Sequence, residues 1–319
     1  MATVTIATFN CENLFARFKF KGKRVKQDGE FVYRPWTKEE LAEIADKGFD
    51  VDMAKFETLT GDMRTLTAQA IFGTGADVIA LQEVESLETL KIFNSQHLKK
   101  SGYKYKVVID GNDPRLIDVA VLSRHPFSSL MTNQFRRTQN NKSYVFSRDC
   151  LEVGIQVTAT KQIHLFVNHF KSMVGGRPQT MNRRKIQSEE VVKILKERYG
   201  SNPGAKEWVV LGDLNDYIPS TGLAPLLDQP WLENVVQTRT EDENERWTHY
   251  WDDKEEYQQL DYILLSKALA DKNPSAVPVI ERRGLPRRAE RYTGERFEGV
   301  GQSKPKASDH CPVSIKLKL

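Results

Sequence analysis

Several features that would place this 319-residue chain in a specialised class of protein are scarce or missing. It has only three cysteines, Cys11, Cys150 and Cys311, too few and too scattered for a disulfide framework or a zinc site. Reduced, buried thiols and a cytoplasmic location are therefore expected. The first residues, MATVTIATFN, lack the basic start of a signal peptide and the long apolar run of a membrane anchor, unless an export signal has been removed.

Internal repeats and low-complexity segments are also missing, and no stretch rich in proline and serine divides the chain. Hydrophobic residues make up 39% of the sequence and charged residues 28%, as in an ordinary globular protein. The length is sufficient to bury a sizeable core. The net charge of +4 permits an anionic partner without requiring one, because evenly spread lysines and arginines would give the same value.

Buried strands are predicted along the whole chain. Runs of apolar and β-branched residues predict strands at 3–9, 77–81, 105–109, 118–122, 148–158, 162–168, 208–211, 262–265 and 313–319. Helical spacing predicts helices at 37–47, with Thr37 as the N-cap, and at 53–72, 87–98 and 182–199. The basic regions 17–34 and 281–296 are expected to be a surface loop or hairpin and a loop, respectively. One domain is favoured over two, with two sheets packed face to face and covered by helices.

The stretch WVVLGDLND, from Trp208 to Asp216, suggests chemistry most directly. Its apolar start predicts a buried strand that ends at Gly212. Asp213 and Asn215 lie two residues apart, so both side chains can point into one pocket. A carboxylate that holds a water, beside an amide that steadies a developing oxyanion, suits hydrolysis of a phosphate ester. Taken alone, the stretch is better explained as a strand followed by an Asp/Asn turn.

Other predicted strands end in the same kinds of polar residue, and this repetition favours a functional site over a simple turn. The strand ends carry Asn10, Glu12, Glu83, Asn168, His169, Asp213, Asn215, Asp261, Asp309 and His310. Buried strands rarely end in so many carboxylates, amides and imidazoles unless these side chains converge. Because the donors are rich in oxygen, with no paired cysteines and no His-x-x-x-His helix, a hard cation such as Mg²⁺ or Mn²⁺ is favoured over zinc.

Seven segments together resemble the endonuclease/exonuclease/phosphatase superfamily, which includes pancreatic-type deoxyribonucleases and abasic-site endonucleases. They are TFNCENL, IALQEVE, VAVLSRHP, NHFKS, VLGDLND, QLDYILLS and SDHCPV, in the family's order and across nearly the whole chain. Each is weak alone, but the set is specific. The resemblance implies an α+β fold, a four-layered α/β/β/α sandwich of two packed mixed β-sheets flanked by helices, with the site at one edge. Residues 1–319 would form a single domain, with an insertion around 17–66 that matches nothing in the family pattern.

The resemblance also implies a metal site. Glu83 resembles the principal metal ligand, and Asn10 a metal or phosphate contact. Glu12 lies where many members have a second acid, and Asp309 would be a further carboxylate on the metal side. Asn13 is expected to be a turn residue, although some relatives use an Asn there. The implied cofactor is Mg²⁺ or Mn²⁺, for which Ca²⁺ could substitute as an inactive or structural ion.

The catalytic roles that the resemblance implies fall on five residues. His310 resembles either the general base or the imidazole that stabilises the scissile phosphate, and Asp261 would fix its tautomer and raise its basicity. His169 resembles a second histidine that contacts a phosphate oxygen, although an isolated histidine after a strand is more often structural. Asp213 would orient the attacking water, and Asn215 would help to hold the pentacovalent transition state. Together they imply metal-assisted in-line hydrolysis.

Three basic residues are candidates for binding phosphates of the substrate. Arg148 lies where deoxyribonuclease-like members hold a phosphate, although a surface salt bridge with Asp149 would explain it equally well. Lys171 and Arg184 belong to a basic cluster around the loop that follows His169 and the start of the fourth predicted helix. Two more basic clusters occur, one in the insertion and one near residues 282–291. If two of the three clusters flank the site, they would neutralise backbone phosphates beyond the scissile one.

The first functional hypothesis is a divalent-metal-dependent phosphodiester hydrolase that acts on nucleic acid, with DNA as the preferred substrate. Little base specificity is expected, because no zinc finger or basic helix-turn-helix is visible. The alternative is a phosphatase or phosphodiesterase acting on a small phosphoester or a phospholipid headgroup. Against it, QLDYILLS lacks the Trp-Cys-Asp-Arg segment of the inositol-phosphatase branch, and no amphipathic membrane segment is present. A catalytically inactive binding protein ranks last, since no expected acid or histidine is missing; neither a membrane nor an obligatory protein partner is expected.

Overall fold

The structure is a computed structural model that describes residues 2–20, 22–27, 30–35, 37, 39–40, 54–58 and 61–319. The chain forms two compact units. Met1–Leu14 and Thr60–Leu319 form the large unit, and Phe15–Leu59 form the small unit. The small unit overlaps the insertion expected around residues 17–66, whereas the expectation of one domain over residues 1–319 stays a prediction.

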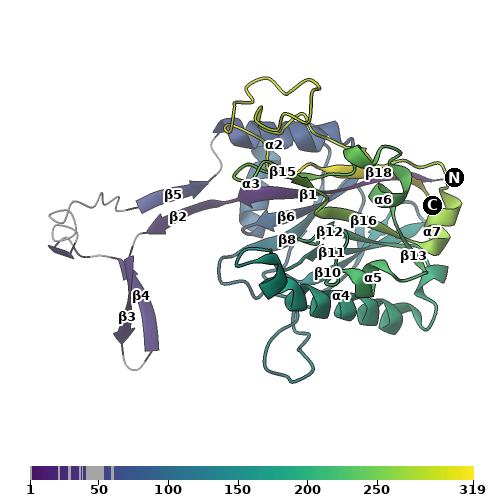
Figure 1. The fold of residues 1–319 in the computed structure, drawn as a ribbon, viewed down its shortest axis with the longest axis horizontal. Helices are drawn as coiled ribbons and strands as arrows, with labels where there is room; N and C mark the ends of the chain where they lie inside the picture. The colour runs from purple at the N-terminus through teal and green to yellow at the C-terminus, as the bar shows by residue number, and fades with distance from the viewer. Residues whose placement is uncertain are drawn as a thin grey trace. The chain divides into compact units, whose positions relative to one another are not determined.

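The large unit contains two six-stranded mixed sheets (Figure 1). The first sheet has the order β17 (Val279–Ile280), β18 (Val313–Lys318), β1 (Thr3–Leu14), β6 (Val78–Val84), β8 (Asp118–Ser123) and β7 (Tyr105–Val108). Strands β1 and β6 run parallel, and the other neighbours in this sheet run antiparallel.

The second sheet repeats this arrangement. Its order is β13 (Leu232–Asn234), β16 (Asp261–Ser266), β12 (Trp208–Asp213), β11 (Gln162–His169), β10 (Cys150–Gln156) and β9 (Phe127–Met131). Here β11 and β12 are the parallel pair, and the other neighbours run antiparallel. Because the carboxyl ends of parallel strands lie at the same edge of a sheet, each sheet gathers two strand ends at one place.

The alternation of side chains along the strands builds two layers of core. In β12, Val209 and Leu211 belong to the cluster between the two sheets, whereas Trp208 and Val210 pack with α4 (Arg177–Tyr199) and α5 (Ala224–Leu227). Helices α2 (Gly61–Gly73) and α3 (Leu87–His97) lie on the opposite side, against the first sheet (Figure 1). The layers therefore follow the order helix, sheet, sheet, helix, and the fold expected from the sequence is confirmed.

Shorter elements complete the large unit. They are η1 (Pro203–Ala205), α6 (Val235–Arg239), η2 (Glu243–Glu245), the hairpin of β14 (His249–Trp251) and β15 (Glu256–Gln258), and α7 (Lys267–Lys272). The helix ends follow from local chemistry: Ser86 caps α3 by accepting a hydrogen bond from the backbone of Thr89, and Gly200 ends α4 with a φ of 82°, which glycine adopts at little cost. No helix of the described residues is both long enough and apolar enough to cross a membrane.

The small unit contains two antiparallel strand pairs, β2 (Ala16–Phe20) with β5 (Ala54–Thr58) and β3 (Gly22–Gln27) with β4 (Glu30–Pro35). Of the two forms expected over 17–34, a surface loop or a hairpin, the antiparallel pair of β3 and β4 is the hairpin. The helix expected over 53–72 is wrong in its first part, because 54–58 pair with β2 as a strand and α2 begins only at Gly61. Thr37 and Glu40 form the reciprocal hydrogen bonds of a capping box, and the remainder of the helix expected at 37–47 lies outside the described residues.

Candidate active site

The register of the strands brings polar residues of both sheets to one edge. In the second sheet, Asp213 at the end of β12 is level with His169 on β11 and with Asp261 on β16. In the first sheet, Asn10 is level with Gln82, directly before Glu83. The Nδ2 atom of Asn10 donates a hydrogen bond of 3.0 Å to Oδ2 of Asp213, so the two sheets are joined at this edge.

Four side chains surround the Oδ2 atom of Asp213. Asn10 and Asn215 donate to it through their Nδ2 atoms, at 3.0 and 2.9 Å. The Nε2 atoms of His169 and His310 lie 3.6 and 3.9 Å away. Asp213 itself is only 1% exposed. A single buried carboxylate oxygen is therefore the point on which the strand ends converge.

The His310 ring is held by a buried chain of hydrogen bonds. Its Nδ1 atom lies 2.9 Å from Oδ2 of Asp261, and the Thr248 hydroxyl donates to the same oxygen at 2.8 Å. The backbone amides of Leu260 and Asp261 donate in turn to that hydroxyl, both at 3.0 Å. This arrangement fixes the ring so that Nε2 points toward Asp213.

The two histidines at the site have opposite electrostatic environments. Burial alone would lower the pKa of His310, but the carboxylates of Asp261 and Asp213 hold this pKa well above its ordinary value. Burial lowers the pKa of His169 well below its ordinary value, and the positive charges of Arg148 and His310 add to this effect. The site therefore favours one protonated and one neutral imidazole. Burial also raises the pKa of Asp213, with His310 opposing the shift.

Backbone strain is concentrated at the same strand ends. Glu12, Asn13, Glu83 and Asn215 have φ angles of 49°, 66°, 62° and 53°, in the left-handed region that residues other than glycine rarely adopt. Such conformations cost on the order of 1–3 kcal/mol each and persist where the surrounding structure holds them. Here the backbone amide of Asn13 donates to Oε2 of Glu83 at 2.9 Å, which ties two of the strained turns together. Strain of this kind is typical of functional sites.

The residues expected to bind metal offer a donor set that fits a hard divalent cation. Burial raises the pKa of Glu83, and Asp309 adds to this shift while His310, Arg148 and Asn10 oppose it, so each of these groups acts on Glu83. Burial would also raise the pKa of Asp309, but positive groups nearby, first among them Lys306, lower it to about 2. Amide and carboxylate oxygens from Asn10, Glu83 and Asp309 are the ligands that Mg²⁺ and Mn²⁺ prefer.

Glu12 has a supporting position in this set. Its Oε2 atom lies 2.9 Å from Nζ of Lys306 and accepts a hydrogen bond of 3.0 Å from the backbone amide of Asp309. The Glu12 carboxylate therefore neutralises a buried lysine and positions the peptide that carries Asp309. The backbone amide of Glu12 donates to Oδ1 of Asn10 at 3.0 Å, which orients that side chain.

Two of the three basic residues expected to bind phosphate lie beside this cluster. Arg148 is 2% exposed, and its Nε atom lies 3.3 Å from Oδ2 of Asp113, so the alternative surface salt bridge with Asp149 is not formed. Its Nη2 atom has no hydrogen-bond partner within the described part of the chain. Lys171 has no ion-pair partner among the described residues, and burial, then Arg148, lowers its pKa. Both cations can therefore accept an external anion.

Arg184 is not brought to the open side of the site. It is fully buried, its Nε donates to Oδ2 of Asp216 at 2.9 Å, and its Nη2 donates to the carbonyl of Arg177 at 2.9 Å. Its Nη1 donates to the carbonyl of Lys171 at 3.2 Å and to Oγ1 of Thr180 at 2.7 Å. Arg184 thus holds the loop that carries Lys171 in place, and the geometry gives it a structural role instead of direct phosphate binding.

Much of the basic cluster near 282–291 is also paired within the protein. Arg282 lies 2.8 Å from Glu245 and stacks on Trp247, and Arg288 lies 3.4 Å from Asp252. These cations stabilise an irregular segment and offer little free charge to a substrate.

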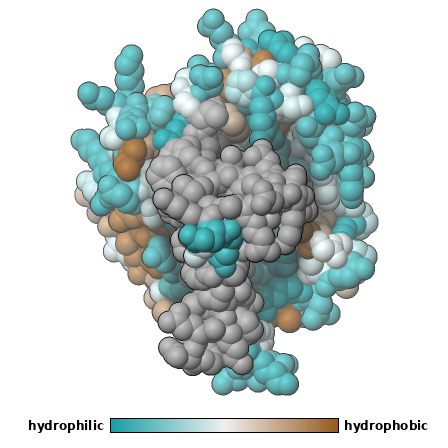
Figure 2. Space-filling view, turned by 90° about the vertical axis from the view of Figure 1, so that its left-hand side faces the viewer, coloured by the Kyte–Doolittle hydropathy of each residue, from teal (hydrophilic) through white to brown (hydrophobic). Residues whose placement is uncertain are grey.

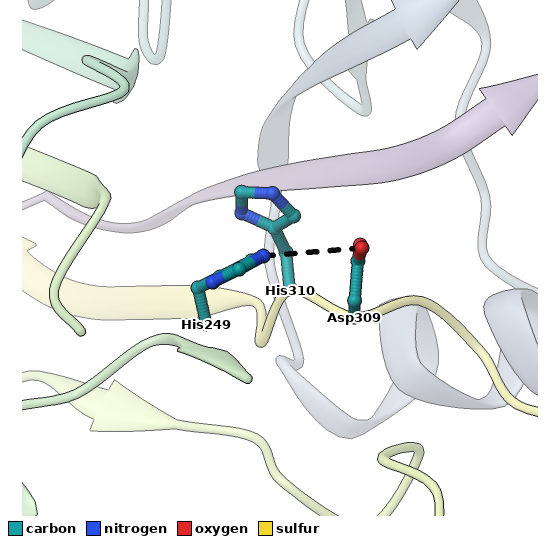
Figure 3. Close-up of side chains that lie close together, drawn as sticks. All are labelled: His249, Asp309 and His310. Atoms are coloured by element: carbon teal, nitrogen blue, oxygen red, sulfur yellow. Dashed lines mark ion pairs between the residues drawn. The ribbon is translucent and has the colours of Figure 1, made fainter. Parts of the chain in front are cut away.

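Sequence reasoning missed three residues that contribute to the site, Thr248, His249 and Lys306. His249 faces His310 across an isolated β-bridge, and its Nε2 atom lies 3.9 Å from Oδ2 of Asp309 (Figure 3). None of the three follows a predicted strand, so the pattern of polar strand ends could not find them. The one available indication for His249 was that the chain has only six histidines, which makes each worth testing as a ligand.

Two packed mixed sheets with such a polar edge define a four-layered hydrolase fold. The chain belongs to the Endonuclease/Exonuclease/phosphatase family, whose model matches residues 5–318. The family resemblance expected from the sequence is thereby confirmed. The sequence matches none of the curated proteins with which it was compared.

Solved structures share the fold across the full chain. An endonuclease/exonuclease/phosphatase family protein from Bacteroides thetaiotaomicron superposes with a TM-score of 0.61 at 15% identity, covering 99% of this chain and 97% of that one. A truncated TDP2 from Caenorhabditis elegans gives 0.59 at 14% identity, covering 99% and 98%. Beta toxin from Staphylococcus aureus gives 0.60 at 14% identity, covering 99% and 100%. At these identities the likeness concerns the fold alone.

Proposed function

We propose that this protein is a divalent-metal-dependent phosphodiester hydrolase that acts on nucleic acid in the cytoplasm, with DNA as the preferred substrate and little base specificity. The observation that carries the proposal is the convergence of four polar side chains from both sheets on the Oδ2 atom of Asp213. Membership of a family whose enzymes generally depend on divalent metal ions supports it.

The residues around Asp213 suit activation of a water molecule. A buried carboxylate with a raised pKa is a better proton acceptor than an ordinary aspartate, and the amides of Asn10 and Asn215 hold it in one orientation. Because the pKa of His310 is raised, its ring is assigned the role of stabilising the charged phosphate through Nε2 rather than that of the general base. Of the two roles that the family resemblance left open for His310, we therefore propose the stabilising one.

The remaining groups position the phosphate. His169, neutral and buried, can donate or accept a hydrogen bond at a phosphate oxygen without adding charge. A divalent cation held by Asn10, Glu83 and Asp309 would neutralise negative charge on the scissile phosphate. Mg²⁺ or Mn²⁺ is the cofactor proposed for this position.

A polymeric substrate is favoured by the basic residues beside the site and by the hydrophilic character of one face of the molecule. Lys171 has no ion-pair partner among the described residues, and Arg148, although paired with Asp113, keeps its Nη2 atom without a hydrogen-bond partner there. The face viewed in Figure 2 is predominantly hydrophilic outside the grey residues, and its hydrophobic residues lie in small separate patches. Such a surface suits a charged backbone better than the acyl chains of a lipid.

The test compares wild-type protein with His310→Ala on plasmid, single-stranded DNA, RNA, a chromogenic phosphodiester and a phosphomonoester, each with Mg²⁺, Mn²⁺ or EDTA. We expect nicking or degradation of DNA that EDTA abolishes and that His310→Ala lowers by at least about 100-fold. His97→Ala, in the last turn of α3, is the matched control and should retain full activity. Turnover confined to small esters, or binding of DNA without turnover, would overturn the proposal.

A further inference from the structure

His249 lies where the backbone fixes it directly against the proposed catalytic centre. The amide of Tyr250 donates to the carbonyl of Asp309 at 2.9 Å, and the amide of Cys311 donates to the carbonyl of Thr248 at 2.6 Å. These bonds flank His249 and His310, which therefore form the close kind of antiparallel pair, with both side chains on the same face. Their ring centroids are 4.6 Å apart.

The geometry around His249 suits a metal ligand. Its Nε2 atom lies 3.9 Å from Oδ2 of Asp309, too far for a hydrogen bond (Figure 3). One cation can bridge such a gap, since imidazole nitrogen and carboxylate oxygen each bind zinc-like ions at about 2.0–2.2 Å. One ligand atom from each of His249, Asp309 and His310 lies within 4.8 Å of the other two.

A purely structural role for His249 leaves its polar atoms unexplained. The residue is 8% exposed, and neither ring nitrogen has a hydrogen-bond partner among the described residues: Nδ1 is buried, and Nε2 is the atom that faces Asp309. Buried polar groups without partners are uncommon, and each calls for an explanation such as an ion or a functional role. By contrast, the partly buried His164 contacts Glu152 at 3.1 Å, which accounts for it. The nearby Lys306 is paired with Glu12 at 2.9 Å, although its charge also acts on Asp309 and His249.

We propose that His249, Asp309 and His310 form a cation position that selects borderline ions such as Zn²⁺ or Co²⁺ over Mg²⁺. Two imidazoles and one carboxylate favour such ions, whereas the oxygen donors of Asn10 and Glu83 favour Mg²⁺. The Asp309 carboxylate, which has two oxygens, would be shared between the two positions. Binding of the cation releases the proton of the His310 Nε2 atom to solvent, and the ring is then no longer available to the phosphate. Zn²⁺ and Co²⁺ therefore inhibit the hydrolysis that Mg²⁺ supports. This inhibition rests on the proposed function. Binding of the ion does not depend on the proposed function.

The binding test uses Co²⁺ alone as the probe, because its visible absorption reports nitrogen ligands directly. Metal-free protein is titrated with Co²⁺ in a large excess of Mg²⁺, which occupies the oxygen-donor position. We expect one equivalent of Co²⁺ to bind to the wild type with ligand-field bands, and His249→Phe to weaken this binding by at least about tenfold. His97→Phe, on α3, is the matched control and should bind as the wild type does.

Two further measurements distinguish loss of the ligand from loss of the fold. Circular dichroism checks that His249→Phe is folded, and His249→Gln, which replaces the imidazole by an amide, is the second variant and should also lose the bands. Unchanged affinity and spectrum in both folded variants, or no Co²⁺ binding by the wild type, would overturn the proposal.

The inhibition test measures the concentration of Zn²⁺ that halves Mg²⁺-supported plasmid cleavage. We expect this concentration to be at least about tenfold higher for His249→Phe than for the wild type, in line with loss of one ligand. If the wild type and His249→Phe are inhibited by the same concentration of Zn²⁺, the proposed inhibition through His249 is wrong. If the wild type cleaves no substrate, the proposed function fails, while the Co²⁺ spectra still decide whether the cation position exists.

Discussion

At the scale of single residues, one carboxylate oxygen of Asp261 sets the orientation of the His310 ring and raises its pKa. It contacts the His310 ring and accepts the Thr248 hydroxyl, and both interactions are fully buried. The low-dielectric surroundings strengthen the attraction between this carboxylate and a protonated imidazole. The contrast with His169, which is buried without a close carboxylate hydrogen bond, shows how position sets the properties of two identical side chains.

The substitution Asp261→Asn tests this coupling. We expect turnover to fall by about two to four orders of magnitude, because the ring loses both its orientation and the stabilisation of its charged form. In metal-free protein the pKa of His310 should fall toward the ordinary value, as measured by NMR titration of the imidazole. A histidine pKa unchanged in the folded variant would contradict this account.

The same pair predicts how stability depends on pH. The folded-state pKa of His310 lies above the unfolded value of about 6.5, so the pair contributes its full stability below that value and loses it as the pH rises through the folded pKa. The difference in unfolding free energy between wild type and Asp261→Asn, measured in urea without metal, should therefore shrink toward alkaline pH.

Lys171 is the residue at which phosphate binding can be separated from chemistry. Because its ammonium has no ion-pair partner in the described structure, Lys171→Ala should weaken DNA binding several-fold and reduce the salt slope of log K by about one. Fluorescence anisotropy with a short duplex in EDTA measures both. Lys185→Ala, an exposed position on α4, is the control, and an identical slope in both variants would remove Lys171 from the binding surface.

At the scale of elements, the site depends on how strand β12 ends. Gly212 has a φ of 136°, and a Cβ atom there would lie 1.9 Å from the carbonyl oxygen of Asn168 on β11. No side chain fits between these two strands at that level. The close approach of the backbones is what places His169 and Asp213 next to each other.

Gly212→Ala should therefore lower the unfolding free energy by at least about 2 kcal/mol and disrupt the site, because the backbones must separate. Urea denaturation followed by tryptophan fluorescence measures the change. Gly61→Ala is the control, since nothing lies within 4 Å of its Cβ position and alanine favours a helix. A Gly212→Ala protein as stable as the wild type would show that the strands can relax.

Sequence patterns predicted most elements of the large unit but not their pairing. The strands β6, β8, β11 and β12 lie close to the expected ranges, because their apolar runs are long enough to identify. The helix expected over 53–72 was wrong in its first part because 54–58 are extended by pairing with β2, far away in the sequence. Helical spacing of apolar residues cannot reveal such a partner.

At the scale of the whole molecule, all the residues assigned to the site belong to the large unit, and they come from both ends of the chain. Replacing residues 16–59 by a short glycine–serine linker should therefore leave a folded protein that still cleaves a chromogenic phosphodiester. Cooperative thermal unfolding and the rate on this small substrate are the measurements. Loss of cooperative folding, or of turnover on the small diester, would show that the small unit is required by the large one.

The sequence by itself determined which chemical groups are available and which strands end in them, because residue type and periodicity are local properties. It therefore predicted the layered fold and the meeting of Asn10, Glu83, Asp213 and His310. Only the tertiary structure decided that Arg184 is buried beneath the site and that His249 lies against Asp309. The partners of a side chain depend on which distant segments pack together and in which register, and no local pattern contains that information.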